Sequence, residues 1–203
     1  MVRFFKHFNT ILKHKYWVYK YCSRAGIPLQ GIFHDLSKLS PAEFIESAKY
    51  YQGNRSPIDA CKEANGYSKA WLHHKGRNMH HYEYWQDNFD KGGEAILMPY
   101  NYAVEMLCDF MGAGRAYMGK NFSTEAEKKW WENKKPSVKA MHPALKIFLD
   151  ECFKNIDLCF SKSVKNNKIV LYSNYLYAKN CYLEEKDEEM YEKQIARKMG
   201  GFK

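Results

Sequence analysis

Apolar residues recur at intervals of three and four in several stretches of the chain, and this spacing constrains the fold more than any other feature. The first such stretch is residues 3–24, which carry Phe5, Phe8, Leu12, Tyr16 and Tyr19. Because an α-helix has 3.6 residues per turn, this spacing places the five side chains on one side of a helix. No stretch alternates polar and apolar residues over several strands. The sequence therefore predicts an all-α fold.

Serine, proline and glycine indicate where the helices begin and end. Ser40-Pro41-Ala42-Glu43 has the order of a capping box, which predicts a helix start. Ser56-Pro57 has the same order of a capping serine and a proline, and it predicts a helix over 57–75 that bends near Gly66. DKGG at 90–93 reads as a loop. Further helices are expected over 30–38, 98–120, 124–134, 143–160, 167–181 and 187–199. The expected architecture is a helical bundle over 1–122 with a C-terminal helical extension over 123–203.

Composition and charge exclude several classes of protein. No apolar run approaches the ~18 to 20 residues of a membrane span, and basic residues interrupt the N-terminal segment as they would not in a secretory signal. We therefore expect a cytoplasmic protein that makes no use of a membrane. The net charge of +9 is spread over the chain, which disfavours nucleic acid as a partner and fits a small anionic substrate. Nothing indicates an oligomeric state.

The six cysteines form no C-x-x-C pair, and several of them lie in apolar helical stretches. Buried free thiols are therefore expected, in preference to disulfides or zinc ligands.

Histidines and aspartates gather in the first half of the chain. Five of the eight histidines lie between residues 34 and 81, in HDLSK at 34–38 and HHKGRNMHHYE at 73–83. EMLCDF at 105–110 adds Glu105 and Asp109, one helical turn apart. Neutral imidazoles and carboxylates are the ligands that a divalent cation needs, and a buried carboxylate pair demands a cation. The set predicts a metal centre.

The spacing of these residues along the chain predicts how their side chains are placed. We expect His34 and Asp35 to lie on a helix, where adjacent side chains diverge by roughly 100°. Lys38 follows them by four and three residues, so it is placed to contact a carboxylate or a bound anion. The helix that holds His73 and His74 should end near Gly76. The chain then turns back to present His80 and His81.

The order of these motifs resembles the HD-domain superfamily of metal-dependent phosphohydrolases. HDLSK with a later HHxE looks like the HD-GYP branch, although no G-x-G-Y-P follows HHYE, so cyclic dinucleotide specificity does not transfer. A closer resemblance is to bacterial and phage proteins of unknown activity with the pattern HDxSK, HHxxNxHHxE and EMxxDW. The resemblance covers residues 7–120. It implies an HD-domain-like helical bundle.

Carried over residue by residue, the resemblance implies one or two divalent ions, which could be Fe, Mn, Zn, Ni, Co or Mg. A first ion would be held by His14, His34, Asp35 and Asp109. A second would be held by His74, His80 and His81, with Asp35 as a bridge. Only one member of the His73–His74 pair is needed, and we favour His74.

The resemblance also implies an activity, the hydrolysis of a phosphate ester or nucleotide by a metal-activated water. The residues assigned to the reaction are Lys38, Glu83 and Glu105, and those assigned to the anionic substrate are Lys38, Lys75, Arg77 and Arg115. Two alternatives stay open. Some HD-fold proteins use the same ligand order in a di-iron oxygenase, and the metal could instead stabilise a protein without catalytic activity.

Overall fold

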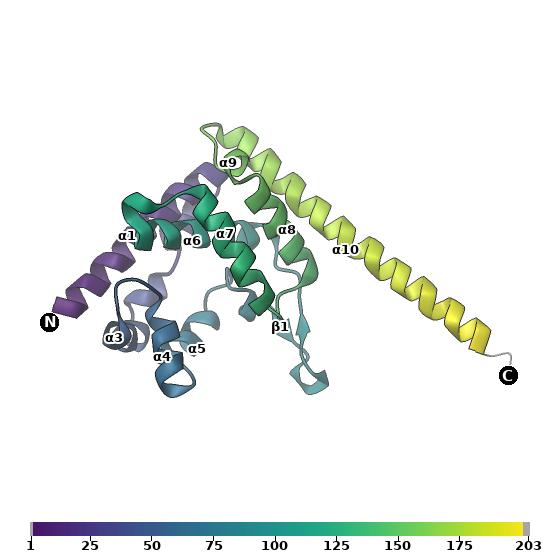
Figure 1. Ribbon diagram of the computed structural model, residues 1–203, viewed down its shortest axis with the longest axis horizontal. Helices are drawn as coiled ribbons and strands as arrows, with labels where there is room; N and C mark the ends of the chain where they lie inside the picture. The colour runs from purple at the N-terminus through teal and green to yellow at the C-terminus, as the bar shows by residue number, and fades with distance from the viewer. Residues whose placement is uncertain (1, 201–203) are drawn as a thin grey trace.

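The computed structural model describes the backbone of residues 2–200 and the side chains of residues 2–190. It is all-α apart from one short hairpin (Figure 1). The α-helices are α1 (Val2–Ala25), α2 (Pro28–Phe33), α3 (Pro41–Tyr50), α4 (Pro57–Asn65), α5 (Lys69–Lys75), α6 (Tyr100–Met118), α7 (Thr124–Lys134), α8 (Pro143–Lys154), α9 (Ile156–Cys159) and α10 (Val164–Gly200).

Short elements connect these helices. Five are 3₁₀ turns, namely η1 (Leu36–Leu39), η2 (Tyr82–Tyr84), η3 (Phe89–Lys91), η4 (Gly119–Asn121) and η5 (Lys135–Ser137). Strands β1 (Gln86–Asp87) and β2 (Glu94–Ala95) pair antiparallel, with Gln86 opposite Ala95. The predicted DKGG loop closes this hairpin, and Gly92 and Gly93 both adopt positive φ there.

Helices α1 and α6 form the centre of the molecule. Their backbones approach closely at Gly112, where an added Cβ would lie 2.4 Å from Cγ2 of Val18. The main core continues from this contact into α7, α8 and α10, and its largest fully buried side chains include Trp131, Phe148 and Leu171. The hydrophobic core is thus shared between residues from both parts of the predicted architecture.

Several predicted helix boundaries were wrong. The helix expected over 57–75 is two helices, because Gly66 takes positive φ (79°) and the Ser68 hydroxyl caps a new helix by accepting the Trp71 N–H. The helix expected over 143–160 is interrupted at Asn155. Conversely, the helices expected over 167–181 and 187–199 are parts of α10. The linking residues YLEEK contain neither glycine nor proline, and Leu, Glu and Lys favour helix.

Two local predictions near the N-terminus were also wrong. Helix α3 begins at Pro41 as expected, but no capping box forms, since the buried Ser40 hydroxyl has no hydrogen-bond partner among the described residues. In α1 the predicted apolar stripe faces outward, with Phe5 59% and Tyr16 55% exposed. The inward face carries His7 and His14 together with apolar residues. Helical periodicity identified the helix but not the side that is buried.

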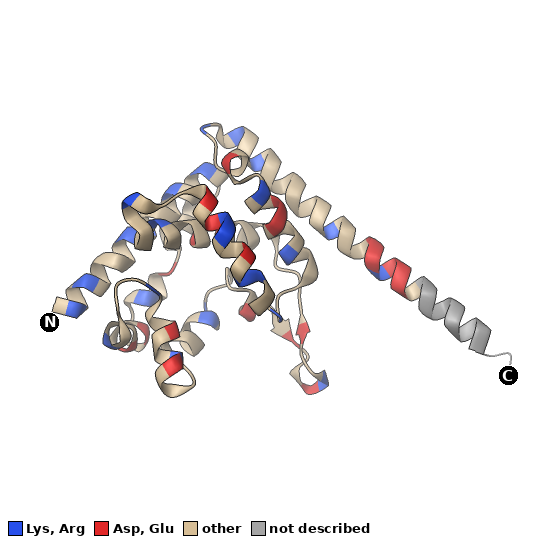
Figure 2. Ribbon diagram, viewed as in Figure 1, with Lys and Arg blue, Asp and Glu red and all other residues tan. Residues whose placement is uncertain are grey.

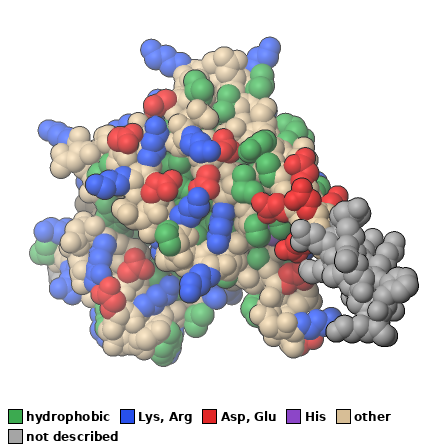
Figure 3. Space-filling model, turned by 45° about the vertical axis from the view of Figure 1, so that its right-hand side comes forward, with side chains coloured by type: hydrophobic (Ala, Val, Ile, Leu, Met, Phe, Trp, Pro, Cys, Tyr) green, Lys and Arg blue, Asp and Glu red, His purple; other side chains and the backbone are tan. Residues whose placement is uncertain are grey.

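The remaining global expectations concern cysteines, charge and membranes. All six cysteines are free thiols, and Cys181 alone is not fully buried. On the face drawn in Figure 3, Lys and Arg side chains are interspersed with Asp and Glu. Among the described residues, no helix is both long enough and apolar enough to cross a bilayer.

Candidate metal centre

Five separate segments bring the predicted metal ligands together in the interior. His14 comes from α1, and His34 and Asp35 lie between α2 and η1. His74 lies on α5, His80 and His81 precede η2, and Asp109 lies on α6. Every one of these side chains is buried except that of His81, which is partly buried. As expected, α5 ends at Gly76 and the chain turns back to present His80 and His81.

The backbone at His34 and Asp35 differs from the prediction. These residues are not on one helix, because α2 ends at Phe33 and Asp35 adopts a left-handed conformation with φ 55°. Such a conformation is uncommon for a residue other than glycine, although Asp tolerates it better than most. It turns the chain sharply, so that both adjacent side chains enter the same cluster. The expected 100° divergence on a helix is therefore not what places them.

The first group of candidate ligands is His14, His34, Asp35 and Asp109. The Nε2 atom of His14 lies 3.3 Å from Nε2 of His34 and 3.1 Å from Oδ1 of Asp109. Oδ2 of Asp35 lies 3.4 Å from Nε2 of His14 and 3.2 Å from Nε2 of His34. Ligand atoms about 2.0–2.2 Å from one cation are roughly 3.0–3.5 Å from each other. The four atoms therefore have the spacing of one coordination sphere.

The second group is Asp35, His74, His80 and His81. Oδ1 of Asp35 lies 3.1 Å from Nε2 of His74 and 3.4 Å from Nε2 of His80. Ligand atoms of the whole group lie within 4.8 Å of one another. The two oxygens of Asp35 thus face different sets of histidines, Oδ2 the first group and Oδ1 the second. Asp35 has the placement of a bridging carboxylate.

Unpartnered atoms show that this cluster fits a cation. Oδ1 of Asp35 and the buried Nε2 atoms of His74, His80 and His81 form no hydrogen bond among the described residues, although Oδ1 lies within 3.4 Å of the Nε2 atoms of His74 and His80. Nδ1 of each of these two histidines faces a glutamate instead. Buried polar atoms are normally satisfied, and leaving one unpaired costs about 1–3 kcal/mol. Each of these atoms has a lone pair to offer to a metal, so the donor set could hold metal ions.

Glu105 orients two of the histidines from behind. Its Oε1 lies 3.0 Å from Nδ1 of His34 and 3.2 Å from Nδ1 of His80, which leaves both Nε2 atoms facing the cluster. Burial alone would raise the pKa of Glu105, but the two histidines lower it to about 2. A carboxylate that accepts the second ring N–H of a ligating histidine fixes its tautomer. Glu105 therefore supports both groups.

Glu43 performs the same role for His74, and the sequence did not reveal it. Its Oε2 accepts a hydrogen bond of 2.7 Å from Nδ1 of His74, while its Oε1 accepts one of 2.7 Å from Nδ1 of His73. His73 belongs to none of the groups that could hold a metal, which agrees with the choice of His74. In the sequence, Glu43 has the position of the last residue of a capping box, and nothing else in the sequence indicates its contact with the histidines.

Lys38 lies against the same bridging carboxylate. Its Nζ forms an ion pair with Oδ2 of Asp35 across one 3₁₀ turn. Burial alone would lower the pKa of Lys38, but Asp35 and Asp109 raise it above its usual value, so the side chain is a cation. The expected contact between Lys38 and a carboxylate of the site is present.

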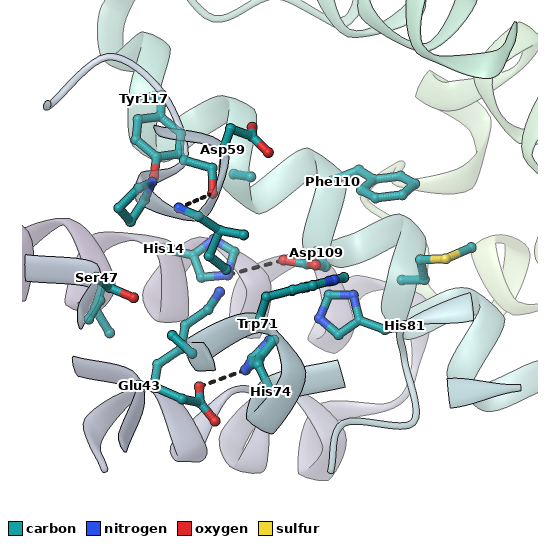
Figure 4. A pocket seen from close by; sticks show the side chains of 18 of the residues that line it. His14, Glu43, Ser47, Asp59, Trp71, His74, His81, Asp109, Phe110 and Tyr117 are labelled. Carbon is teal, nitrogen blue, oxygen red and sulfur yellow. Dashed lines mark hydrogen bonds and ion pairs between the residues drawn. The ribbon is translucent and has the colours of Figure 1, made fainter. Parts of the chain in front are cut away.

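A cavity of about 310 Å³ opens beside the cluster. Lys38 and four candidate ligands, His14, His74, His81 and Asp109, line it, so it reaches both groups. Figure 4 shows Trp71 lying among these ligands. The ring of Trp71 lies 4.9 Å from that of His81. The lining also includes the aromatic side chains of Phe110, Tyr117 and Trp130. The cavity has the size and character of a small-molecule site.

Other predicted site residues lie elsewhere. Glu83 lines the cavity but forms no hydrogen bond or ion pair with a described histidine of the cluster, and burial raises its pKa. Lys75 is the last residue of α5 and Arg77 lies just beyond it, and neither lines the cavity. Arg115 is also outside the cavity lining, because its guanidinium stacks on Phe122 and Trp17 and donates to the Tyr21 hydroxyl. Of the four predicted anion-binding residues, the structure brings Lys38 alone to the cluster.

Comparison with known proteins identifies a family for this chain. A family model described as "Family of unknown function (DUF5662)" matches residues 3–155, from the start of α1 to the end of α8. The match includes every residue of the candidate centre. No curated protein and no solved structure matches the chain.

Proposed function

The chain belongs to DUF5662, a family of unknown function, and we propose from its own residues that it is a metal-dependent phosphohydrolase. Its substrate would be a small phosphate ester, hydrolysed by water that two divalent cations activate. One observation carries the proposal. The two oxygens of Asp35 lie against two different sets of histidines, Oδ2 near His34 and Oδ1 near His74, as a carboxylate shared by two cations requires.

The donor set favours particular cations. Five imidazoles and two carboxylates suit Mn, Fe, Co, Ni or Zn better than Mg, which prefers oxygen ligands alone. Bound together, two such cations would polarise a phosphoryl group and lower the pKa of a water molecule toward about 7. Glu105 and Glu43 would hold the histidines in the orientation that this binding needs.

Lys38 is the group best placed to bind the phosphate of the substrate. It lines the cavity and contacts Asp35, so its ammonium lies at the boundary between the cluster and the open space. An ammonium group in this position attracts an anion and stabilises the negative charge that develops during phosphoryl transfer. Because its pKa is raised above the usual value, Lys38 stays charged and does not act as a base.

The cavity would hold the organic part of the ester. Trp71, Phe110 and Tyr117 give its wall planar apolar surfaces, and burying such surfaces stabilises binding by about 25 cal/mol per Å². Closing this wall around the substrate would also exclude bulk water from the ester. The proposal therefore favours esters of an apolar or aromatic alcohol over inorganic polyphosphates.

The test uses metal-free protein that is reloaded with Mn and kept without oxygen. We expect phosphate release from at least one ester of a phosphomonoester and nucleotide panel, because hydrolysis needs no redox change. Lys38→Ala should keep the bound metal and lose about 10²-fold in turnover. Lys179→Ala removes an exposed lysine on α10, a helix that contributes no residue to the cavity lining, and should match the wild type.

Two other results would replace the proposal. Failure of every ester with every metal, combined with oxygen uptake by the iron form alone, would favour an oxygenase on the same ligands. Stable metal binding without either activity would favour a metal that only stabilises the fold. Normal turnover by Lys38→Ala would contradict the role given to that residue.

A further inference from the structure

One lysine of α1 reaches the backbone of the metal centre. Helix α1 carries six Lys and Arg residues and no Asp or Glu, as the blue segments in Figure 2 show. Five of the six are exposed, whereas Lys15 is partly buried. Its side chain extends along the protein toward the segment that follows α2, where it meets backbone oxygens and not a carboxylate. Lys15 is therefore in a different position from a solvated surface lysine.

The two oxygens that Lys15 contacts lie at the end of α2. Its Nζ donates to the carbonyl oxygen of His34 at 2.5 Å and to that of Ile32 at 3.3 Å. The last carbonyl groups of a helix have no partner within the helix, and a nearby lysine can supply one. Within residues 2–200, no backbone N–H donates to either of these oxygens. Lys15 thus caps α2 from the neighbouring helix.

The contact with His34 also bears on the turn between two candidate ligands. Its carbonyl belongs to the peptide group that joins His34 to Asp35. Because a peptide group is planar, its orientation is set by ψ of His34 and φ of Asp35, which are 128° and 55°. A donor that holds this oxygen in place holds the left-handed conformation of Asp35, and with it the direction of the Asp35 side chain.

Helix α1 provides both this donor and a ligand. His14, the residue before Lys15, belongs to the first group of candidate ligands, and its Nε2 lies 3.4 Å from Oδ2 of Asp35. The backbone of α2 also approaches α1 closely, since an added Cβ at Gly31 would lie 2.9 Å from Cα of Tyr19. Tyr19 is about one helical turn beyond Lys15. The turn at Asp35 is therefore held at a fixed place relative to His14.

We propose that Lys15 is a positioning residue of the metal centre. It holds the peptide group between His34 and Asp35 against α1, and so keeps the two oxygens of Asp35 directed at two sets of histidines. Lys38 acts differently, because it pairs with the carboxylate of Asp35 and lines the cavity, whereas Lys15 does not line it. The inference rests on the metal centre of the proposed function and not on the reaction performed there.

Titration of the metal-free protein with Co²⁺ tests this role. Loss of a group that orients metal ligands typically weakens metal binding by about 10- to 100-fold. Lys15→Met keeps much of the side-chain length and removes both hydrogen bonds, so it should weaken Co²⁺ binding by about tenfold. It should also change the visible absorption of the bound Co²⁺, which depends on ligand geometry. Lys15→Arg keeps a donor and should restore both the affinity and the spectrum.

Two controls separate positioning from a general loss of stability. Lys13→Met alters an exposed lysine of the same helix and should match the wild type. Ile156→Val removes one methyl group from the main core at α9, so it should lower the melting temperature and leave Co²⁺ binding unchanged. Far-ultraviolet circular dichroism will show which variants are folded. Lys15→Gln, whose shorter side chain cannot reach both oxygens, should also weaken binding and replaces Lys15→Met if that variant does not fold.

Several results would overturn the proposal. They are wild-type affinity and spectrum in Lys15→Met, an equal loss of affinity in either control, or no recovery in Lys15→Arg. No hydrolysis enters these measurements. A wild type that binds Co²⁺ and hydrolyses no ester would therefore contradict the proposed function alone, whereas a wild type that binds no Co²⁺ would overturn both.

Discussion

Glu127 provides a test of the structure that does not depend on metal binding. It lies on α7 and is 4% exposed, and its carboxyl group forms no hydrogen bond or ion pair with the described residues. The carboxyl lies against Gly114 of α6, where an added Cβ would be 1.9 Å from Oε1. The nearby Arg115 is engaged with the hydroxyl of Tyr21. Burial raises the pKa of Glu127 from 4.5 to about 7.

The sign of the effect on stability follows from the two states. Below about pH 4.5 the carboxyl is protonated in both the folded and the unfolded chain, so it makes no difference to stability. Between about pH 4.5 and 7 the unfolded chain releases this proton while the folded chain retains it, and stability falls as pH rises. Above about pH 7 the carboxyl is ionised in both states, so the loss of stability has reached its full value and no longer changes with pH. A pKa shift of one unit corresponds to about 1.4 kcal/mol, so the shift from 4.5 to about 7 lowers the free energy of unfolding by at most about 3 kcal/mol. Screening by the remaining solvent contact reduces this loss to about 2 kcal/mol.

Glu127→Gln keeps the shape of the side chain and removes the titration. We expect equal free energies of unfolding near pH 4.5 and a variant that is about 2 kcal/mol more stable at pH 8. Urea denaturation of both proteins between about pH 4.5 and 8 measures the difference in their free energies of unfolding. The other titrating groups contribute equally to both proteins, so they cancel from this difference. Glu132→Gln, an exposed glutamate on the same helix, is the control and should show no such trend. A difference independent of pH, or a variant less stable at pH 8, would refute the reasoning.

Three further predictions follow from contacts described above. Gly112→Ala should lower the free energy of unfolding by about 3 kcal/mol, since its methyl group would overlap Val18 where α1 and α6 cross. Calorimetry measures this loss of stability, and an unchanged melting temperature would contradict the close approach of the two helices. Asp35→Ala should remove both metal ions and His80→Ala at most one, measured by elemental analysis, and equal loss would argue against a bridge. Thiol titration of the native protein should label Cys181 first, with all six cysteines reacting only after unfolding.

The chemistry of the candidate centre was readable from the sequence because it resides in residue types. Imidazoles and carboxylates keep their identity as ligands wherever the chain places them, so HDLSK, the two HH pairs and Asp109 indicated a metal site before any fold was known. Helix formation was also largely local, since capping serines such as Ser56 and the apolar spacing act over one or two turns. The all-α class followed from these signals.

Other features depended on which surfaces come into contact. Periodicity showed that α1 is a helix, but packing against α6 decided that the side with His14 is buried and the side with Phe5 is exposed. Glu43 has the sequence position of a capping residue, yet it bonds to His74, thirty-one residues away. Lys75 and Arg77 are as basic as Lys38 but lie outside the cavity lining.

Tertiary structure alone determined the arrangement at Asp35. The sequence placed His34 and Asp35 next to each other, which is compatible with many geometries. The left-handed backbone at Asp35 and the convergence of α1, α5 and α6 set its two oxygens against two different groups of histidines. Ligand identity is a property of single residues and can be read from the chain. The distances between ligands depend on long-range packing, in which residues 20 to 95 positions apart meet, as His14 does with His34 and with Asp109, and no local pattern encodes them.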